Sequence, residues 1–301
     1  MARQLIRIVY EFGLEATCQP DGWVVSSAES KARRVFDSPE AVTDTLGRLP
    51  CLVTKRLDNG LEISSLLRAD SRTPFGLGIT ELFAGPLQPD AMFQCHQIAY
   101  LVGAVAYHCE RMAKVYAAIC RQFAYFLEQV TGGWDRANYG WQTAPYYEFD
   151  AAITAARRAY DASRYLIWKR FGGGGSVPSS FVKALGASAH LPDSLRSRLE
   201  KSWREFGETI TDYRDCIQHY VPIDFGLASA SMEKVADAFW SVLIRIPDNP
   251  EKRSKAAFTY AQRRDALSYC REVAEELLTV MTLVIDSTAR PLSPIDESGE
   301  G

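Results

Sequence analysis

The spacing of the hydrophobic residues changes at about residue 88 and divides the chain into two kinds of sequence. Before this point, short apolar runs alternate at a period of two, as in strands; after it, apolar residues recur every three or four positions, as on helices. We therefore expect a mainly α protein. A helical bundle over 86–289 follows a small α+β lobe over 1–85.

The clearest helix is predicted over 193–219. Its apolar residues step by four and three without a gap, which indicates that this helix packs against another one. Pro222 ends it, because the residue before a proline disfavours the α conformation. The stripe consists of Leu199, Trp203, Phe206, Ile210, Tyr213, Ile217 and Tyr220.

Three further helices are predicted over 90–130, 146–171 and 262–287. The first is one long helix or two stacked ones, and Gly132-Gly133 ends it. The second carries a regular apolar stripe. This stripe consists of Phe149, Ile153, Ala156, Tyr160, Ser163 and Ile167.

Short strands are predicted in two places. In the N-terminal lobe they cover 5–10, 23–26, 51–57 and 61–64, and the last two flank Asn59-Gly60, which favours a hairpin turn. Ser38-Pro39 is typical of the start of a short helix between them.

A second set of strands, over 238–246 and 257–260, is predicted to form a β-hairpin inserted before the last helix. The tail 290–301 is predicted to be disordered.

Composition sets limits on location and partners. The chain has 301 residues, 47% of them hydrophobic and 24% charged, which is typical of a globular protein. The net charge of −3 means that binding to nucleic acid needs a local basic patch. Seven cysteines without a CxxC pair indicate reduced thiols. The most apolar stretch, 98–107, is too short to span a membrane, so we expect a cytoplasmic protein with no membrane partner.

Two motifs resemble cofactor sites but lack their context. The glycine run 172–175 has no Gly-Lys-Ser/Thr ending and follows a helix, so an inter-helix loop is favoured over a phosphate loop. Cys95-His96 and His108-Cys109 lie on one predicted helix, about 20 Å apart. One ion cannot bridge that distance. We therefore predict no metal and no cofactor.

A candidate for chemistry closes the helix over 193–219. Arg214 is followed by Asp215 and, five positions after the arginine, by His219. An arginine binds phosphate through two parallel hydrogen bonds. A histidine, with an ordinary pKa of about 6.5, suits proton transfer near neutral pH. As a bare pattern, an arginine five to seven positions before a histidine is expected about once by chance in a chain of this composition.

This ensemble resembles the HEPN superfamily, a family of helical bundles with an arginine, a polar residue and, after four to six intervening residues, a histidine. The resemblance covers about 146–220 and excludes 1–80. It implies that Arg214 and His219 are catalytic and that Asp215 is the supporting polar residue, where the family more often has asparagine. Active members are metal-independent ribonucleases, often toxins or anti-phage defence effectors, whose site is composed from two motifs across a dimer.

The resemblance leaves two functions open. The first is a homodimeric ribonuclease that cleaves RNA and has an antitoxin or regulatory protein as a partner. The alternative is a non-catalytic module for dimerisation or protein interaction, because many family members have lost catalysis. The chain is therefore expected to be an endoribonuclease, with the second function as the alternative.

Geometry limits how the motif can work. Five residues on a straight helix separate the side chains of Arg214 and His219 by about 140°. Either the last turn unwinds before Pro222, or a second copy of the chain completes the site. In a purely structural role, Arg214 pairs with Asp212 or Glu208, and His219 lies at the negative end of the helix.

Two basic clusters are weak candidates for RNA binding. A charge run of this kind is also typical of a solvated helix face. The first cluster is on the helix over 146–171 and consists of Arg157, Arg158, Arg164, Lys169 and Arg170. The second consists of Lys252, Arg253, Lys255, Arg263 and Arg264.

Overall fold

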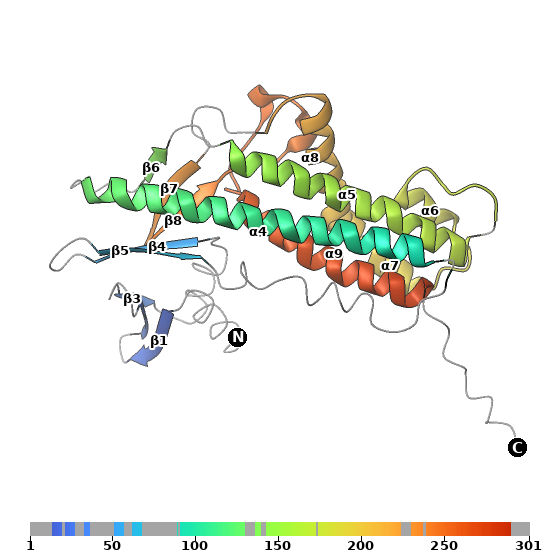
Figure 1. Ribbon diagram of the computed structural model, residues 1–301, viewed down its shortest axis with the longest axis horizontal. Coiled ribbons are helices and arrows are strands. Elements are labelled where there is room, and N and C mark those ends of the chain that lie inside the picture. Colours follow the sequence, from blue (N-terminus) through green and yellow to red (C-terminus); the bar gives the residue numbers. More distant parts are fainter. Residues whose placement is uncertain are drawn as a thin grey trace, which may run out of the picture. The chain divides into compact units, whose positions relative to one another are not determined.

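The structure is mainly helical (Figure 1). The chain divides into two compact units. The computed structural model describes the backbone of residues 14–19, 22–27, 33–36, 51–56, 62–67, 89, 91–129, 136–139, 143–172, 174–223, 230–236 and 239–289. Most of these residues are helical, which confirms the predicted class. Unit 1 comprises 1–74, 108–150 and 219–271, and unit 2 comprises 75–107, 151–218 and 272–301.

Three long helices contribute a segment to each unit. They are α4 (Met92–Gln129), α5 (Ala144–Phe171) and α9 (Ala266–Thr288). The region over 90–130 thus forms one helix and not two. All six residues of the stripe predicted on α5 are completely buried, which confirms that face. None of the helices in the described part of the chain is long and apolar enough to cross a membrane.

Unit 2 is a helical bundle. Besides the segments of the long helices it contains α6 (Phe181–Ala187), α7 (Asp193–Ser202) and nearly all of α8 (Glu208–His219). The glycine run leads from α5 to α6, as predicted, with positive φ angles of 91° at Gly174 and 82° at Gly175. Arg198 of α7 donates two hydrogen bonds of 2.7 and 2.8 Å to the carboxylate of Glu276 on α9.

A π-helical turn, η2 (Trp203–Gly207), separates α7 from α8. The sequence predicts one uninterrupted helix here, with a stripe that steps only by four and three. The predicted stripe is confirmed at Leu199, Ile210 and Tyr213, which are buried, and Trp203 packs against α5 and α6. The uninterrupted helix is wrong, because a π turn bonds residue i to i+5 and adds one residue. Tyr220, the last residue of the predicted stripe, is 53% exposed. The residues that are buried are Leu195, Leu199 and Ser202 before the insertion, then Gly207, Ile210, Tyr213 and Cys216 after it.

An aromatic cluster surrounds the π turn. The Trp203 ring stacks on Phe181 at 5.3 Å and meets the edge of Tyr160 at 5.4 Å. The Tyr160 hydroxyl shares a buried hydrogen bond of 2.8 Å with Ser202. Burial raises the pKa of Tyr160, so this hydroxyl stays protonated. Gly207 leaves room for the indole, because a Cβ there would lie 2.5 Å from the Trp203 ring.

Unit 1 contains two antiparallel sheets. The order in the larger sheet is β5-β4-β8-β7-β6, so N-terminal strands pair with strands from later in the chain, which the sequence did not predict. The smaller sheet has the order β1-β2-β3. The strands are β1 (Leu14–Gln19), β2 (Gly22–Ser27), β3 (Arg33–Phe36), β4 (Cys51–Arg56), β5 (Glu62–Leu67), β6 (Arg136–Tyr139), β7 (Ala230–Ala236) and β8 (Phe239–Ile244).

The strand predictions are confirmed in part. Strands β2, β4, β5 and β8 correspond to predicted strands, and β4 pairs with β5 as a hairpin partner. The pairing of 238–246 with 257–260 is wrong, because β8 pairs with β7 and β4 instead. Residues 257–260 form no strand. The Asn249 side chain fixes the loop that leads to this segment, because it donates to the carbonyl of Ala257 and accepts from the amide of Thr259.

Four sequence-based expectations lie outside the described residues. They are the strand over 5–10, the helix that begins at Ser38, the turn at Asn59-Gly60 and the disordered tail 290–301.

The carboxylate of Asp265 joins three elements of unit 1. It accepts a 2.6 Å hydrogen bond from the Tyr116 hydroxyl on α4 and a 2.9 Å bond from the amide of Ile244 on β8. Its other oxygen accepts from the amide of Ser268 and caps the N-terminus of α9. Burial raises the pKa of Asp265 to about 6, although the hydrogen bonds act in the opposite direction.

Gly207→Ala tests the packing of the π turn. The added methyl group meets the Trp203 ring at 2.5 Å, so we expect the free energy of unfolding to fall by about 1–3 kcal/mol. Gly186→Ala on α6 is the matched control. Its Cβ meets nothing within 4 Å, so the higher helix propensity of alanine stabilises that variant by up to about 1 kcal/mol. Urea unfolding measures both, and equal shifts in the two variants contradict this account.

Asp265→Asn tests the buried carboxylate through pH. Unfolding restores the ordinary pKa of 3.8, so the stability that protonated Asp265 provides below pH 4 is lost as the pH rises to about 6. The stability of the wild type relative to the Asn variant should therefore fall by about 3 kcal/mol across this range. Urea unfolding at a series of pH values measures the difference. A difference that is constant or that grows with pH contradicts the assignment.

Candidate functional site

Arg214 and His219 lie on either side of the buried stripe of α8. The stripe consists of Ile210, Tyr213 and Cys216. At about 100° per residue, Arg214 lies roughly 100° to one side of its centre and His219 roughly 120° to the other. The helix continues through His219, so the last turn does not unwind before the proline. The two side chains of one chain therefore leave α8 in different directions.

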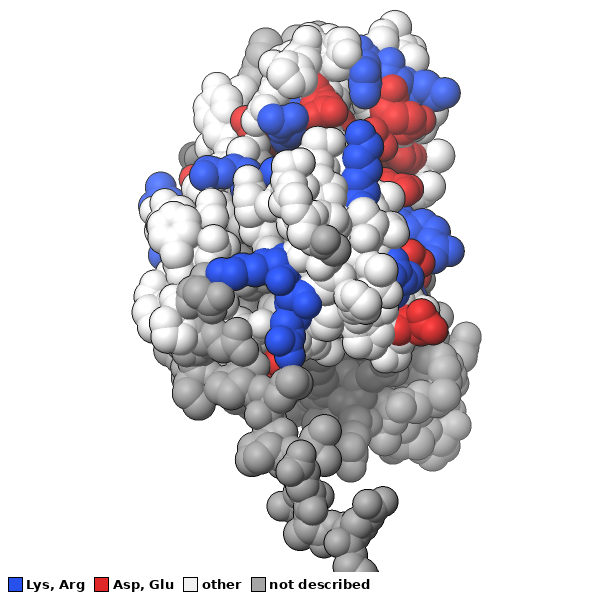
Figure 2. Space-filling model, turned by 90° about the vertical axis from the view of Figure 1, so that its right-hand side faces the viewer, with Lys and Arg blue, Asp and Glu red and all other residues white. Residues whose placement is uncertain are grey.

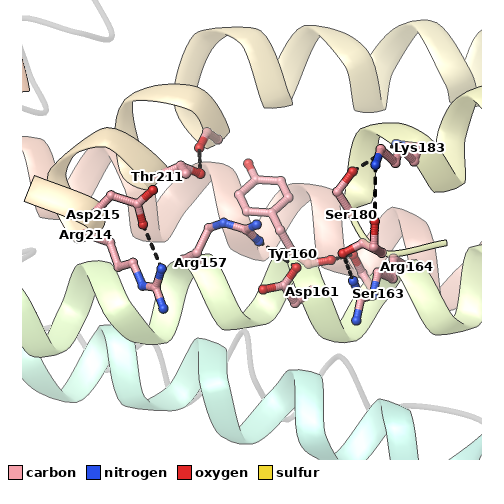
Figure 3. A network of polar contacts seen from close by, with 12 residues as sticks. Arg157, Tyr160, Asp161, Ser163, Arg164, Ser180, Lys183, Thr211, Arg214 and Asp215 are labelled. Carbon is pink, nitrogen blue, oxygen red and sulfur yellow. Dashed lines mark hydrogen bonds and ion pairs between the residues drawn. The ribbon is translucent and has the colours of Figure 1, made fainter. Parts of the chain in front are cut away.

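Arg214 forms an ion pair with the residue that follows it. Its Nη1 atom donates to Oδ1 of Asp215 at 2.7 Å, and the side chains are 36% and 28% exposed (Figure 3). The partner is thus Asp215 and neither Asp212 nor Glu208. A half-exposed guanidinium steadied by one carboxylate keeps donors for an incoming phosphate, since arginine has five N–H groups.

His219 is the last residue of α8 and is exposed. Its ring meets the Tyr220 ring edge-on, with 6.4 Å between the centroids. The guanidinium of Arg253 lies 4.7 Å from the centre of the Tyr220 ring and donates a 2.9 Å hydrogen bond to the Tyr220 hydroxyl. His219, Tyr220 and Arg253 all belong to unit 1. We call these three residues the His219 cluster.

Sequence reasoning did not find the His219 cluster. It placed Tyr220 on an apolar stripe and Arg253 in a separate basic cluster. The two residues are 33 positions apart, and no motif links them. Two features of the sequence are compatible with the cluster. Tyr220 directly follows His219, and the basic residues at 252–255 follow Pro247 and Pro250.

The basic residues predicted on α5 have different environments. Arg157 is mostly buried; it pairs with Asp161 at 2.7 Å, and its guanidinium lies 5.2 Å from the centre of the Trp203 ring. Arg164 donates to the carbonyl of Ser179 at the start of the α6 segment (Figure 3). Both arginines thus make contacts within unit 2. The exposed members of the cluster are Arg158, Lys169 and Arg170.

The Cys-His pairs lie on α4, as predicted, with both cysteines buried. Burial raises the pKa of Cys95. Burial, together with a hydrogen bond to Cys109, raises the pKa of Cys270 well above its ordinary value. His108 bonds to Glu148 at 2.7 Å. Within the described residues, no group of three His, Cys, Asp or Glu side chains is placed to hold a metal ion.

Figure 2 shows one face of the molecule, on which lysine and arginine side chains lie among acidic and uncharged ones. No broad surface of one sign covers this face, in keeping with the net charge of −3. If RNA binds to such a face, its affinity depends on individual lysine and arginine side chains more than on a strong positive electrostatic field over the whole surface.

No protein-family model matches the chain, and neither a curated protein nor a solved structure matches it.

Proposed function

We propose that the chain is a HEPN-like, metal-independent endoribonuclease of the toxin or anti-phage defence type. The observation that supports this most is that Arg214 and His219 both reach solvent, on either side of the buried face of α8. Side chains that reach solvent are able to contact an RNA substrate, which buried ones are not.

The proposed reaction uses the substrate's own hydroxyl group. His219 removes the proton of a 2′-hydroxyl, whose oxygen attacks the adjacent phosphorus. Arg214 stabilises the negative charge that grows on the phosphorane, and Asp215 orients the guanidinium. The P–O5′ bond then breaks, and the leaving oxygen takes a proton from water. The products are a 2′,3′-cyclic phosphate and a 5′-hydroxyl, and no divalent ion takes part.

Two copies of the chain complete each site in this proposal. Arg214 and His219 of one chain face different directions around a helix that stays intact through His219. A phosphate held by Arg214 of one copy therefore meets His219 of the second copy. Twofold symmetry then makes two equivalent sites.

A second candidate function is a non-catalytic interaction module, which an aromatic face on α4 favours. Phe93, Tyr100 and Tyr107 recur every seven residues and are 73%, 74% and 56% exposed. Side chains seven residues apart lie on one face of a helix. Large exposed aromatic residues in a row are typical of a surface that binds another protein.

His219→Ala and Arg214→Ala test the ribonuclease. Each should lower the rate of RNA cleavage by about 10²–10⁴-fold, since each removes a group that acts in the transition state. Stability should change by no more than about 0.5–1 kcal/mol, because both side chains are on the surface. The assays are cleavage of labelled RNA and thermal unfolding.

Tyr213→Ala is the control for folding, because Tyr213 is completely buried beside Arg214. It should cost about 3–5 kcal/mol of stability, as other aromatic truncations in cores do. Cleavage by the wild type should persist in EDTA. If both surface variants cleave RNA normally, or if EDTA abolishes cleavage and Mg²⁺ restores it, the proposed chemistry is wrong. Normal cleavage by the surface variants favours the interaction module.

A further inference from the structure

The His219 cluster combines an exposed aromatic ring with an exposed cation. Tyr220 is 53% exposed, and Arg253 lies over its ring. One guanidinium nitrogen of Arg253 donates to the Tyr220 hydroxyl. Among the described residues, no other side chain or carbonyl accepts a hydrogen bond from this guanidinium, so its remaining donors face solvent.

The loop that carries Arg253 is held in shape by other residues. The Asn249 side chain bonds to the backbone of Ala257 and Thr259, and the Asp248 carboxylate accepts from the amide of Gln262. These contacts fold the loop without the Arg253 side chain. Its position beside Tyr220 is therefore not explained by the stability of the loop.

Arg253 also has an unfavourable backbone conformation. Its φ angle is 53°, in the left-handed region, where it caps the short helix η3 (Pro250–Lys252). Glycine is the usual residue at such a position, because it has no Cβ to crowd the backbone. Arg263 has the same φ angle, so it is the contact with an exposed tyrosine, and not the backbone conformation, that distinguishes Arg253.

The charge of the loop suits a nucleic acid. Residues 247–264 contain five basic side chains and two acidic ones. The basic residues are Lys252, Arg253, Lys255, Arg263 and Arg264, and the acidic ones are Asp248 and Glu251. A positive loop next to an aromatic ring is the usual composition of a surface for single-stranded RNA, where bases stack on aromatic rings and cations contact phosphates.

We propose that Tyr220 and Arg253 bind one nucleotide of single-stranded RNA beside His219. The base stacks on the face of the Tyr220 ring that Arg253 does not cover, and the guanidinium of Arg253 contacts the phosphate of the same or the next nucleotide. This inference rests on the proposed ribonuclease function, for which it supplies the substrate class: unpaired RNA, since a base within a duplex has no free face for Tyr220.

The test is binding of full-length protein to a short, fluorescently labelled 2′-O-methyl RNA. This probe lacks the attacking hydroxyl group and is not cleaved. Tyr220→Leu should raise Kd by about tenfold or more, because stacking of one base contributes roughly 1–3 kcal/mol. Tyr220→Phe and Tyr220→Trp keep the ring and should retain most of the affinity. A double-stranded probe of the same sequence should bind weakly to every variant.

The salt dependence of Kd separates the two roles. Arg253→Gly removes one phosphate contact, so the slope of log K against log salt should fall by about 0.7. Arg253→Lys keeps the charge and should keep the slope. Tyr220→Leu should weaken binding without a change in slope. The glycine variant should be at least as stable as the wild type, because glycine suits the left-handed conformation.

Arg263→Gly is the matched control. Arg263 also has a φ angle of 53° and lies in the same loop, so its replacement removes the same charge and relieves the same kind of strain. We expect a clearly smaller loss of binding than in Arg253→Gly. Equal losses in the two variants, unchanged binding in Tyr220→Leu, or no binding of the probe by the wild type overturns the inference.

Failure of this inference differs from failure of the ribonuclease proposal. If the wild type cleaves RNA while the Tyr220 and Arg253 variants bind and cleave as it does, only the nucleotide site is wrong. If binding depends on Tyr220 and Arg253 but RNA is never cleaved, the nucleotide site is supported and the ribonuclease is rejected.

Discussion

The buried carboxylate of Asp265 holds together the part of unit 1 that carries the His219 cluster. It bonds to α4, to the end of β8 and to the start of α9. Arg245 and Asp265 also pair through their backbones, and the amide of Ile246 donates to the carbonyl of Arg264. These contacts close the loop 246–264 at its base. The position of Arg253 beside Tyr220 therefore depends on a group that lies far from solvent.

The π turn has a comparable role in unit 2. It adds one residue between α7 and α8, and the residues of α8 that are buried beyond it are Ile210, Tyr213 and Cys216. Arg214 and His219 are left on the two flanks of that face. The turn itself depends on Gly207, which accommodates the Trp203 ring.

The sequence predicts those parts that depend on local periodicity and turn residues. The stripe of α5, the helical region of α4 and the hairpin partners β4 and β5 follow from such patterns, whereas the choice between one helix and two over 90–130 does not. The π turn does not, because one inserted residue is invisible when apolar residues happen to continue at the old spacing. The partner of β8 and the Tyr220–Arg253 contact depend on segments distant in the sequence, which periodicity does not pair. The apolar stripe predicts that Arg214 and His219 are exposed, because neither belongs to it. It does not predict which residues lie next to them, such as Arg253 beside Tyr220.

The central claim is that Arg214 of one copy acts with His219 of another, and mixing two inactive variants tests it most directly. Arg214→Ala and His219→Ala chains, unfolded and refolded together in equal amounts, form mixed dimers in which one of the two sites has both residues. About half of the dimers are mixed, so cleavage should recover to about a quarter of the wild-type rate. Native mass spectrometry of differently tagged chains confirms that mixed dimers are present. A mixture that contains them and cleaves no faster than either variant alone contradicts the shared site.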